Sequence, residues 1–321
     1  MNGGFIVLKP PGMTSHDVVA VVRRLTGVRR VGHSGTLDPA AAGVLPTCVG
    51  PAVRLVEYLQ EGRKVYRCRL ILGVTTDTQD ATGQELRRRP VTGSREQLAA
   101  VLPEFTGSIE QVPPMYSSLK SGGQTLHKLA RRGVEVDRPP RRVTIHDLTL
   151  LDYARTGETA RAILEVVCSK GTYVRTLCAD IGERLGAGGH MGFLVRLETG
   201  GYRADEAVTL EELSAARERG ELSGFLHPAA ELLRGWPEMR VGPDEAMAVT
   251  TGRWRSVSGR LINLAAQPPG EGKGPTPADA EPLAKVTCQG ELVAIGRLKA
   301  GPTGDRPLVW VEKAFPRGNE G

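Results

Sequence analysis

The hydrophobic pattern at the N-terminus changes from that of a strand to that of a helix. An apolar run from Phe5 to Leu8 ends in Lys-Pro-Pro-Gly, which predicts a strand that enters a turn. A helix is then predicted from a cap at Thr14 or Ser15 to a stop at Gly27. The apolar face of this helix carries Val18, Val19, Val22 and Leu25.

The segment from Lys64 to Leu72 alternates in a way that predicts a strand in a sheet with one wet face. One side of the strand carries Val65, Arg67, Arg69 and Ile71, and the other carries Tyr66, Cys68, Leu70 and Leu72. Taken by itself, Tyr66 is therefore expected to be a core tyrosine with a hydrogen-bonded hydroxyl.

Further segments show the periodicity of helices and strands along the chain. Helices are predicted over residues 52–59, 94–102, 124–132 and 210–217. Strands are predicted over residues 143–151, 160–168, 292–298 and 308–311, and residues 190–202 are predicted to be a loop followed by a strand. From about Trp236 the helical patterns fade, which places a domain boundary near residues 233–237. The Pro/Gly/Ala-rich stretch over residues 265–281 is predicted to be a mobile loop.

Residues 111–142 carry many cations and are bounded by proline and glycine. Pro113 and Pro114 exclude a helix near the start of this segment, and Gly133 ends a basic helix inside it. Two interpretations remain open. The segment is either a mobile element that closes on an anionic ligand or an ordinary solvated insertion.

A stretch rich in glycine and proline over residues 31–50 contains a single carboxylate, Asp38. Pro39 disfavours a helical conformation at Asp38, while Gly32 and Gly35 allow backbone angles that other residues avoid. We therefore expect Asp38 on a stiff loop that neighbouring apolar residues anchor. By itself, this pattern favours a tight turn, in which the aspartate bonds its own backbone, over a functional carboxylate.

Arg175 falls in the first turn of another predicted helix, which Thr172 caps and which runs from Val174 to Gly186. A cation is disfavoured at this place because the N-terminus of a helix carries partial positive charge. Either a carboxylate compensates Arg175, or its side chain extends into water.

Composition restricts the class of protein more than its function. The 321 residues are 40% hydrophobic and 4% aromatic, which suits a packed core but not a nucleic-acid surface built on many stacking rings. A net charge of +6 favours an acidic partner such as nucleic acid, and it suits a basic surface kept for solubility equally well. The five cysteines form no disulfide or zinc pattern, and the sequence predicts no metal site and no membrane span. We expect a cytoplasmic protein.

Five short motifs follow one another between residues 9 and 175. They are Lys-Pro-Pro-Gly-Met-Thr-Ser at 9–15, Gly-His-Ser-Gly-Thr-Leu-Asp-Pro at 32–39, Thr-Asp-Thr-Gln-Asp at 76–80 after Tyr66, Gln-Val-Pro-Pro-Met-Tyr at 111–116 and Ser-Lys-Gly-Thr-Tyr-Val-Arg at 169–175. Together they resemble the motifs of the TruB-type tRNA pseudouridine synthases. Leu194-Val195-Arg196 stands in the place of a Leu-Arg-Arg of that family, and Leu197 replaces the second arginine of that motif.

This resemblance implies an α+β pseudouridine-synthase fold, with a mixed, largely antiparallel sheet flanked by helices and a small C-terminal PUA-like β domain. We expect a catalytic domain over residues 1–235, with an RNA-clamping insertion at about 111–142, and a PUA-like RNA-binding domain over residues 236–321. The implied reaction is the isomerisation of uridine 55 in the T arm of tRNA, on a flipped-out base and without a cofactor or metal. A monomer without an obligatory protein partner is expected.

The resemblance also assigns roles to residues. Asp38 matches the catalytic aspartate, Arg175 the arginine that pairs with it, and Tyr66 a tyrosine that packs on the uracil and helps to move its C5 proton. It stays open whether Asp38 attacks the base or the sugar, or acts mainly as a base. The implied substrate-binding residues are His33, Gly35, Lys64, Tyr173 and Leu194. The implied RNA-backbone contacts are Lys9, Lys120, Lys128, Arg131 and Arg132.

Other functions compete with this one. The same chemistry on a ribosomal or small non-coding RNA would use the same residues. An RNA chaperone that binds and refolds tRNA would need no nucleophile, so the set Asp38, Tyr66 and Arg175 argues against a purely non-catalytic role. A metal-dependent nuclease is not supported, because the sequence has no clustered carboxylates for the metal.

Overall fold

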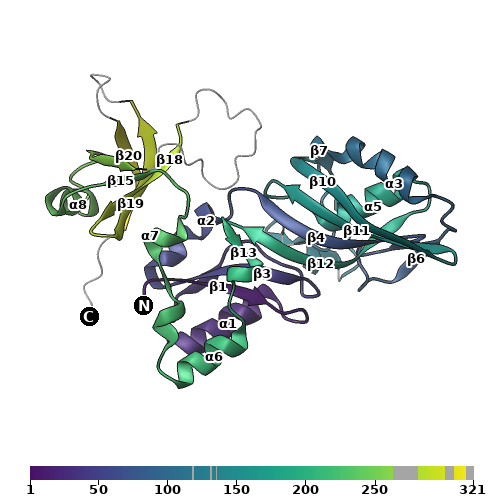
Figure 1. The fold of residues 1–321 in the computed structure, drawn as a ribbon, viewed down its shortest axis with the longest axis horizontal. Helices are drawn as coiled ribbons and strands as arrows, with labels where there is room; N and C mark the ends of the chain where they lie inside the picture. The colour runs from purple at the N-terminus through teal and green to yellow at the C-terminus, as the bar shows by residue number, and fades with distance from the viewer. Residues whose placement is uncertain (118, 131, 135, 263–280, 301–306, 316–321) are drawn as a thin grey trace. The chain divides into compact units, whose positions relative to one another are not determined.

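The computed structural model describes residues 1–117, 119–130, 132–134, 136–262, 281–300 and 307–315. The chain forms two compact units, both made of helices and strands (Figure 1). Unit 1 comprises Met1–Leu37, Val44–Arg63 and Thr199–Gly321, and unit 2 comprises Asp38–Gly43 and Lys64–Glu198. The predicted α+β class is confirmed.

The N-terminal part of unit 1 packs two helices against a few strands. α1 (Ser15–Thr26) begins where the Thr14 hydroxyl accepts a hydrogen bond from the Asp17 N–H, and it ends at Gly27, whose φ is 71°. These bounds confirm the predicted helix. α1 and α6 (Leu210–Glu218) share an apolar core with β1 (Gly3–Lys9), β2 (Val31–His33) and β3 (Ala42–Val49). β2 pairs antiparallel with β3, and β1 lies between β3 and the short β14 (His227–Pro228).

The C-terminal part of unit 1 is a six-stranded sheet with the order β16–β20–β19–β18–β15–β17. Its strands are β15 (Glu238–Arg240), β16 (Ser256–Ser258), β17 (Arg260–Ile262), β18 (Leu283–Cys288), β19 (Glu291–Lys299) and β20 (Leu308–Ala314). The small C-terminal β structure that the resemblance implies is therefore present, and the two strands predicted there are confirmed. The sequence pattern does not reveal α8 (Pro243–Thr250), because its three buried residues are few and mostly alanine.

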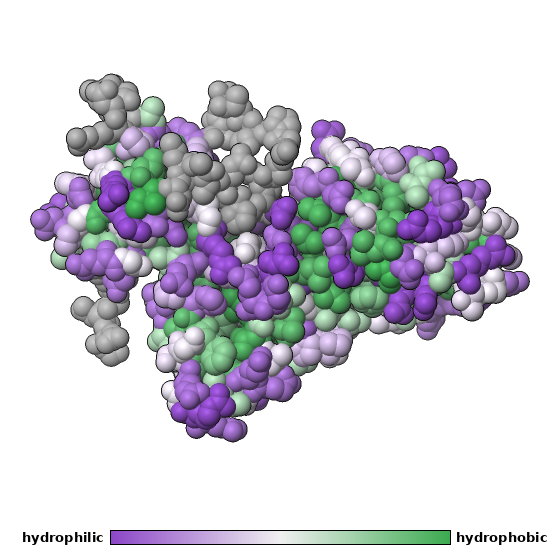
Figure 2. Space-filling view, in the orientation of Figure 1, coloured by the Kyte–Doolittle hydropathy of each residue, from purple (hydrophilic) through white to green (hydrophobic). Residues whose placement is uncertain are grey.

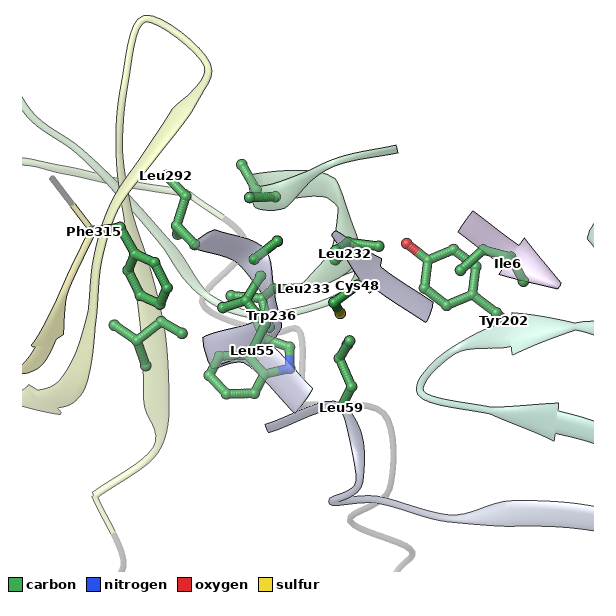
Figure 3. Packing of buried hydrophobic residues seen from close by; sticks show 14 of the residues in the cluster. Ile6, Cys48, Leu55, Leu59, Tyr202, Leu232, Leu233, Trp236, Leu292 and Phe315 are labelled. Atoms are coloured by element: carbon green, nitrogen blue, oxygen red, sulfur yellow. The ribbon is translucent and has the colours of Figure 1, made fainter. Parts of the chain in front are cut away.

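An apolar cluster inside unit 1 joins this sheet to the residues that follow β3 (Figure 3). Leu55 packs in it with Trp236, and Leu292 and Phe315 contribute from the C-terminal strands and their end. Unit 1 thus contains residues from both sides of the predicted boundary between 235 and 236. That division into domains stays a prediction.

Unit 2 is built on a sheet with the strand order β12–β4–β11–β10–β7, in which the neighbours from β4 onward are antiparallel. Its strands are β4 (Lys64–Leu72), β7 (Gly107–Gln111), β10 (Arg141–Thr156), β11 (Thr159–Cys168) and β12 (Gly189–Thr199). Ala42 and Gly43 at the start of β3 pair in parallel with Val195 and Arg196 of β12. The predicted mixed, largely antiparallel sheet is therefore confirmed.

The predicted alternation along β4 is present. Tyr66, Cys68, Leu70 and Leu72 are buried, whereas Arg67 is exposed. α5 (Val174–Arg184) packs against this strand, and the sulfurs of Cys68 and Cys178 lie 3.9 Å apart. On the other face, the Arg69 guanidinium lies 4.9 Å from the centre of the Phe193 ring. Figure 2 shows apolar and hydrophilic residues side by side on the surface over the strands of unit 2.

Short elements complete the two units. In unit 2 they are β5 (Val74–Thr76), β6 (Glu85–Arg88), α3 (Arg95–Val101), the 3₁₀ helix η2 (Leu102–Phe105), β8 (Lys120–Ser121), β9 (Gln124–Thr125) and α4 (Leu126–Ala130). In unit 1 they are η1 (Gly50–Leu55), α2 (Val56–Leu59), β13 (Tyr202–Arg203), η3 (Ala204–Glu206), η4 (Leu222–Phe225) and α7 (Ala229–Leu232). Among the described residues, no helix has the length and apolar character needed to cross a membrane.

Several sequence predictions are wrong in detail. Asp38 lies on a loop as predicted, but the loop is shorter than the stretch over 31–50, because the ends of this stretch pair with each other as β2 and β3. Residues 190–199 are strand throughout, and the predicted helix over 52–59 begins as the 3₁₀ helix η1. The predicted helix over 124–132 does not begin at Gln124, because Gln124 and Thr125 form β9 and α4 begins at Leu126. Thr172 does not cap α5, since its hydroxyl donates to the Ser169 carbonyl. Except for residue 281, the mobile loop predicted over 265–281 lies outside the described residues.

Candidate active site

Asp38 lies on the loop between β2 and β3, and both sides of this residue are held. Before it, the Ser15 hydroxyl donates to the Leu37 carbonyl over 3.2 Å and accepts from the Leu37 N–H over 3.0 Å. After it, the Ala41 N–H donates to the Asp38 carbonyl over 3.0 Å. The backbone thus forms a turn, and the Asp38 carboxylate points from this turn towards Arg175.

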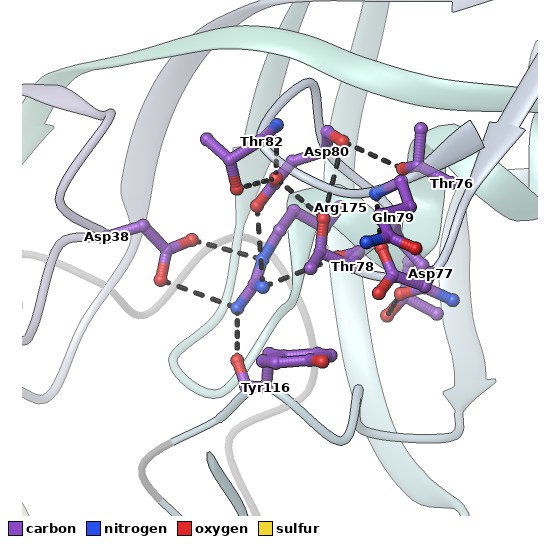
Figure 4. Close-up of polar contacts among 11 residues, drawn as sticks. Asp38, Thr76, Asp77, Thr78, Gln79, Asp80, Thr82, Tyr116 and Arg175 are labelled. Carbon is purple, nitrogen blue, oxygen red and sulfur yellow. Dashed lines mark hydrogen bonds and ion pairs between the residues drawn. The ribbon is translucent and has the colours of Figure 1, made fainter. Parts of the chain in front are cut away.

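Arg175 contacts the Asp38 carboxylate with two nitrogen atoms (Figure 4). Its Nε lies 3.0 Å from Oδ2 and its Nη2 donates to Oδ1 over 3.4 Å. The Arg175 side chain is only 7% exposed, whereas that of Asp38 is 35% exposed. A two-point contact fixes the plane of a carboxylate. The prediction that a carboxylate compensates Arg175 at the start of its helix is confirmed.

Three further contacts hold the Arg175 guanidinium. Nη2 donates to the Tyr116 carbonyl over 2.8 Å, and Nη1 lies 3.5 Å from the Thr78 carbonyl oxygen and 3.6 Å from Oδ2 of Asp80. One buried cation is therefore shared by two carboxylates, those of Asp38 and Asp80. Tyr116 belongs to the predicted insertion, so this segment also contributes to the group.

The polar turn between β5 and β6 presents Asp80 to Arg175. Oδ1 of Asp80 accepts from the Thr78 hydroxyl over 2.8 Å, from the Thr82 hydroxyl over 2.6 Å and from the Thr82 N–H over 2.9 Å. Gln79 has a φ of 62°, and its side chain accepts a hydrogen bond from Thr176 of α5. These bonds make the turn a fixed support for the second carboxylate.

Tyr66 lies on the buried face of β4 and is 7% exposed. Burial raises the pKa of its phenol, the Arg196 guanidinium lowers it and donates a hydrogen bond to the phenol oxygen, and Asp38 raises it. Arg196 is itself buried on β12, and burial lowers its pKa. Asp38 and Tyr66 are therefore close enough to act on each other electrostatically.

Tyr173 belongs to the same group of side chains. The Tyr173 N–H donates to Oε1 of the buried Gln111 over 3.0 Å. Burial raises the pKa of Tyr173, a hydrogen bond with Ser117 and the charge of Arg175 lower it, and Asp38 raises it. Leu194 is buried on β12. Unit 2 thus brings together Asp38, Tyr66, Tyr173 and Arg175.

Other predicted site residues are placed differently. On β2, the ring of His33 packs edge-on against His16, with ring centres 5.4 Å apart. Gly35 has a φ of 76°, and Lys64 at the start of β4 is buried. Lys9 has no exposed area and donates to the carbonyl of the next residue over 2.9 Å. A lysine without exposed area is not placed to reach an RNA phosphate, so Lys9 is not proposed as a backbone contact.

The cations of the predicted insertion are described only in part. The side chains of Lys120 and Lys128 and the whole of Arg131 lie outside the described residues. Arg132 is exposed, and its Nη1 donates to the side chain of Gln124 over 3.2 Å. The proposed RNA contacts of these four residues stay predictions.

Three residues of this site, Asp80, Tyr116 and Arg196, were not identified from the sequence. Asp80 is one of two acids in a polar turn, and nothing in the turn indicates its distant partner. Tyr116 acts through its backbone carbonyl, which carries no signal in a sequence. Two features of the sequence mark Arg196, a charge inside the apolar strand Phe-Leu-Val-Arg-Leu and its place in the motif Leu-Val-Arg, but neither indicates its contact with Tyr66.

The chemistry of this group follows from its side chains. It offers a partly exposed carboxylate as a nucleophile, a guanidinium that positions it, and a phenol that can move a proton. Among the described residues, no group of histidine, cysteine and acidic side chains could hold a metal ion. The arrangement therefore suits covalent catalysis in which the Asp38 carboxylate attacks the substrate.

Two family models match the chain. The TruB family pseudouridylate synthase N-terminal domain matches residues 23–174, and the tRNA pseudouridylate synthase B C-terminal domain matches residues 175–234. The tRNA pseudouridine synthase B of Moorella thermoacetica is 53% identical over 71% of this chain and 76% of its own length. The protein of the same name from Pelotomaculum thermopropionicum is 41% identical over 94% of this chain and 93% of its own length.

Two solved structures share the fold of this chain. A chain of the Cbf5–Nop10–Gar1 complex matches with a TM-score of 0.72 at 25% identity, over 98% of this chain and 85% of that chain. A chain of the archaeal box H/ACA Nop10–Cbf5 complex, with a TM-score of 0.70 at 24% identity, covers 98% of this chain and 86% of its own and shares the fold. From its family models and these relatives, the chain belongs to the TruB family of pseudouridylate synthases, which are isomerases.

Proposed function

We propose that this chain isomerises uridine 55 in the T arm of tRNA to pseudouridine, with Asp38 as the nucleophile. The ion pair between Asp38 and Arg175 carries the proposal, because it holds a partly exposed carboxylate in a fixed orientation near a tyrosine. Relatives named tRNA pseudouridine synthase B support tRNA as the substrate, at 53% and 50% identity. The position in the T arm rests on the motif resemblance.

The reaction breaks the C–N glycosidic bond of a uridine, turns the uracil over and rejoins it to the ribose through carbon. Nothing is oxidised and no atom is added overall, so the reaction needs no cofactor. Asp38 forms a covalent intermediate, and Arg175 fixes the direction of its attack. This geometry serves attack on the base and attack on the sugar equally. Tyr66 takes the proton that C5 of the uracil loses.

The target base lies inside a folded RNA loop and has to leave its stack first, at a cost of a few kcal/mol. Tyr66 and Leu194 then offer an aromatic and an aliphatic surface to the extruded uracil, and His33 occupies the vacated place in the RNA. Arg132 and the other cations of the insertion contact phosphates. Affinity should therefore fall with rising salt, because phosphate contacts release counterions.

The proposed enzyme is a cytoplasmic monomer that needs no protein partner to modify tRNA. Light scattering after size exclusion would give the mass of one chain, and purified protein alone would be active. Activity that appears only after a cell extract is added would contradict this part of the proposal.

Tritium release from a tRNA transcript labelled with [5-³H]uridine tests the function. We expect the wild type to release label from the complete transcript and from a T-arm hairpin. A transcript in which cytidine replaces uridine 55 should release none. Mapping the modified base after carbodiimide treatment names the site. Release at the same rate without uridine 55 would contradict the T-arm assignment. No release from any transcript, with tight binding to all of them, would favour the chaperone function instead.

A further inference from the structure

Arg196 is a cation in the interior of unit 2. Its side chain is only 1% exposed, and it lies on β12 between the half-buried Val195 and Leu197. Alternation along a strand puts Arg196 on the same face as Leu194, the proposed wall of the uracil site. Burying an arginine is costly unless its charge meets a specific partner. The partner therefore indicates the role of this residue.

The phenol oxygen of Tyr66 is such a partner. β4 and β12 are neighbouring strands, and the Arg196 guanidinium donates a hydrogen bond to this oxygen. Other charged or titratable groups face it from two more elements, Cys168 on β11 and Asp38 on the loop before β3. Burial raises the pKa of Tyr66 most, Cys168 and Asp38 also raise it, and Arg196 lowers it.

The backbone of Arg196 is held by the loop that carries Asp38. Gly43 pairs in parallel with Arg196 and has a φ of 117°. A Cβ atom at Gly43 would lie 2.2 Å from the Arg196 carbonyl oxygen, so the two backbones approach more closely than any other residue allows. Arg196 thus contacts Tyr66 through its side chain and the Asp38 loop through its backbone.

We propose that Arg196 is a positioning residue for the proton transfer at Tyr66, where it holds the phenol oxygen and stabilises negative charge on it. The inference rests on the proposed synthesis of pseudouridine. In that reaction the Tyr66 phenolate takes the C5 proton, so that a C–H bond breaks, an O–H bond forms and the electron pair restores the double bond of the ring. The phenol then releases this proton to water, and N1 of the uracil takes one from water, so protons balance.

Single-turnover tritium release across a pH range tests this role. Arg196→Met is expected to lower the rate near neutral pH at least about tenfold, with unchanged affinity for tRNA. The rise of the rate with pH should move to higher pH, because loss of the cation raises the pKa of Tyr66. Arg196→Lys keeps a cation and should restore part of the rate. Arg69→Met is the matched control, since Arg69 lies on the opposite face of β4 above Phe193, and its rate and pH dependence should stay unchanged.

A double-mutant comparison gives a second criterion. Arg196→Met should add no further loss to Tyr66→Phe, because Arg196 acts through Tyr66. An unchanged pH dependence, or a loss that adds in full to that of Tyr66→Phe, would overturn the proposal and leave Arg196 a packing residue. Should Arg196→Met not fold, Arg196→Gln and Arg196→Lys provide the same comparisons with polar side chains.

A spectroscopic readout separates this inference from the proposed function. The phenolate absorbance of the protein minus that of its Tyr66→Phe variant gives the Tyr66 pKa without any reaction. Suppose that the Tyr66 pKa is higher in Arg196→Met than in the wild type, but that the wild type releases no tritium. This result would reject the proposed function and leave the Arg196–Tyr66 contact in place. If the wild type releases tritium but the Tyr66 pKa is the same in Arg196→Met, only the role of Arg196 is rejected.

Discussion

At the scale of single residues, the site depends on one guanidinium that several acceptors share. Arg175 contacts the carboxylates of Asp38 and Asp80 and the carbonyl of Tyr116. A guanidinium presents five N–H donors in one plane, so it can serve all three acceptors at once. Because Arg175 is almost fully buried, water has little room to replace a donor that is removed.

Replacing Arg175 by lysine tests the need for this planar group. We expect turnover to fall at least about 10²-fold with little change in tRNA affinity, because an ammonium group cannot contact both carboxylates and the Tyr116 carbonyl together. Arg184→Lys is the matched control, since Arg184 lies at the other end of α5, pairs with Glu104 and is 55% exposed. Single-turnover tritium release measures both variants. Equal rates in the two would argue against the planar contact.

Asp80→Asn removes one of the two negative charges on Arg175 and keeps an acceptor for Thr78 and Thr82. The rate should fall about tenfold or more, because the guanidinium would then be drawn towards its remaining charged partner and shift the Asp38 carboxylate. Asp77→Asn changes the same turn at a carboxylate that accepts from the Gln84 N–H. The account fails at this point if tritium release is as fast in Asp80→Asn as in Asp77→Asn.

At the scale of elements, the parallel contact of β3 with β12 fixes the exit of the Asp38 loop at Gly43. Gly43→Ala should lower the free energy of unfolding by at least about 2 kcal/mol, because a positive φ and a backbone clash are imposed together. Gly107→Ala shares a positive φ of 90° but has no atom within 4 Å of the added carbon, so its loss should be about 1 kcal/mol. Urea denaturation measures the free energy of unfolding of both variants. Equal decreases in Gly43→Ala and Gly107→Ala would show that the backbone at Gly43 moves to relieve the clash.

Local patterns predicted the elements that local interactions define. The caps and apolar faces of α1, α3 and α6 and the alternation of β4 are all readable in the sequence. β2 and the start of β12 were not predicted, because their extended form depends on pairing with residues far along the chain. The same holds within the site. The position of Arg175 at a helix start implied a carboxylate partner, but the Asp80 and Arg196 contacts have no local cause.

At the scale of the whole molecule, buried ionisable groups make stability depend on pH. Burial raises the pKa of Asp180 on α5 from 3.8 to about 6. The folded state therefore holds this proton more tightly than the unfolded state. The stability that the protonated carboxyl contributes is fully present below about pH 4 and is lost as the pH rises through about 6.

Asp180→Asn should remove this dependence, because the amide stays neutral. The variant should gain about 1 kcal/mol in free energy of unfolding near pH 8 and nothing near pH 4, since partial exposure of Asp180 reduces the full effect of about 3 kcal/mol. Asp152→Asn on the exposed part of β10 is the control and should change stability at neither pH. A gain of equal size at both pH values would show that charge is not the cause.

The central claim, that Asp38 is the nucleophile of an RNA isomerase, is tested most directly by comparing wild type with Asp38→Asn on one [5-³H]uridine-labelled tRNA. Filter retention measures binding in the same samples, and urea denaturation checks the fold. The account predicts tritium release by the wild type and none above background by the variant, with similar affinities and stabilities. Release by Asp38→Asn at the rate of the wild type would contradict it, and joint loss of fold and binding would make Asp38 a structural residue of its turn.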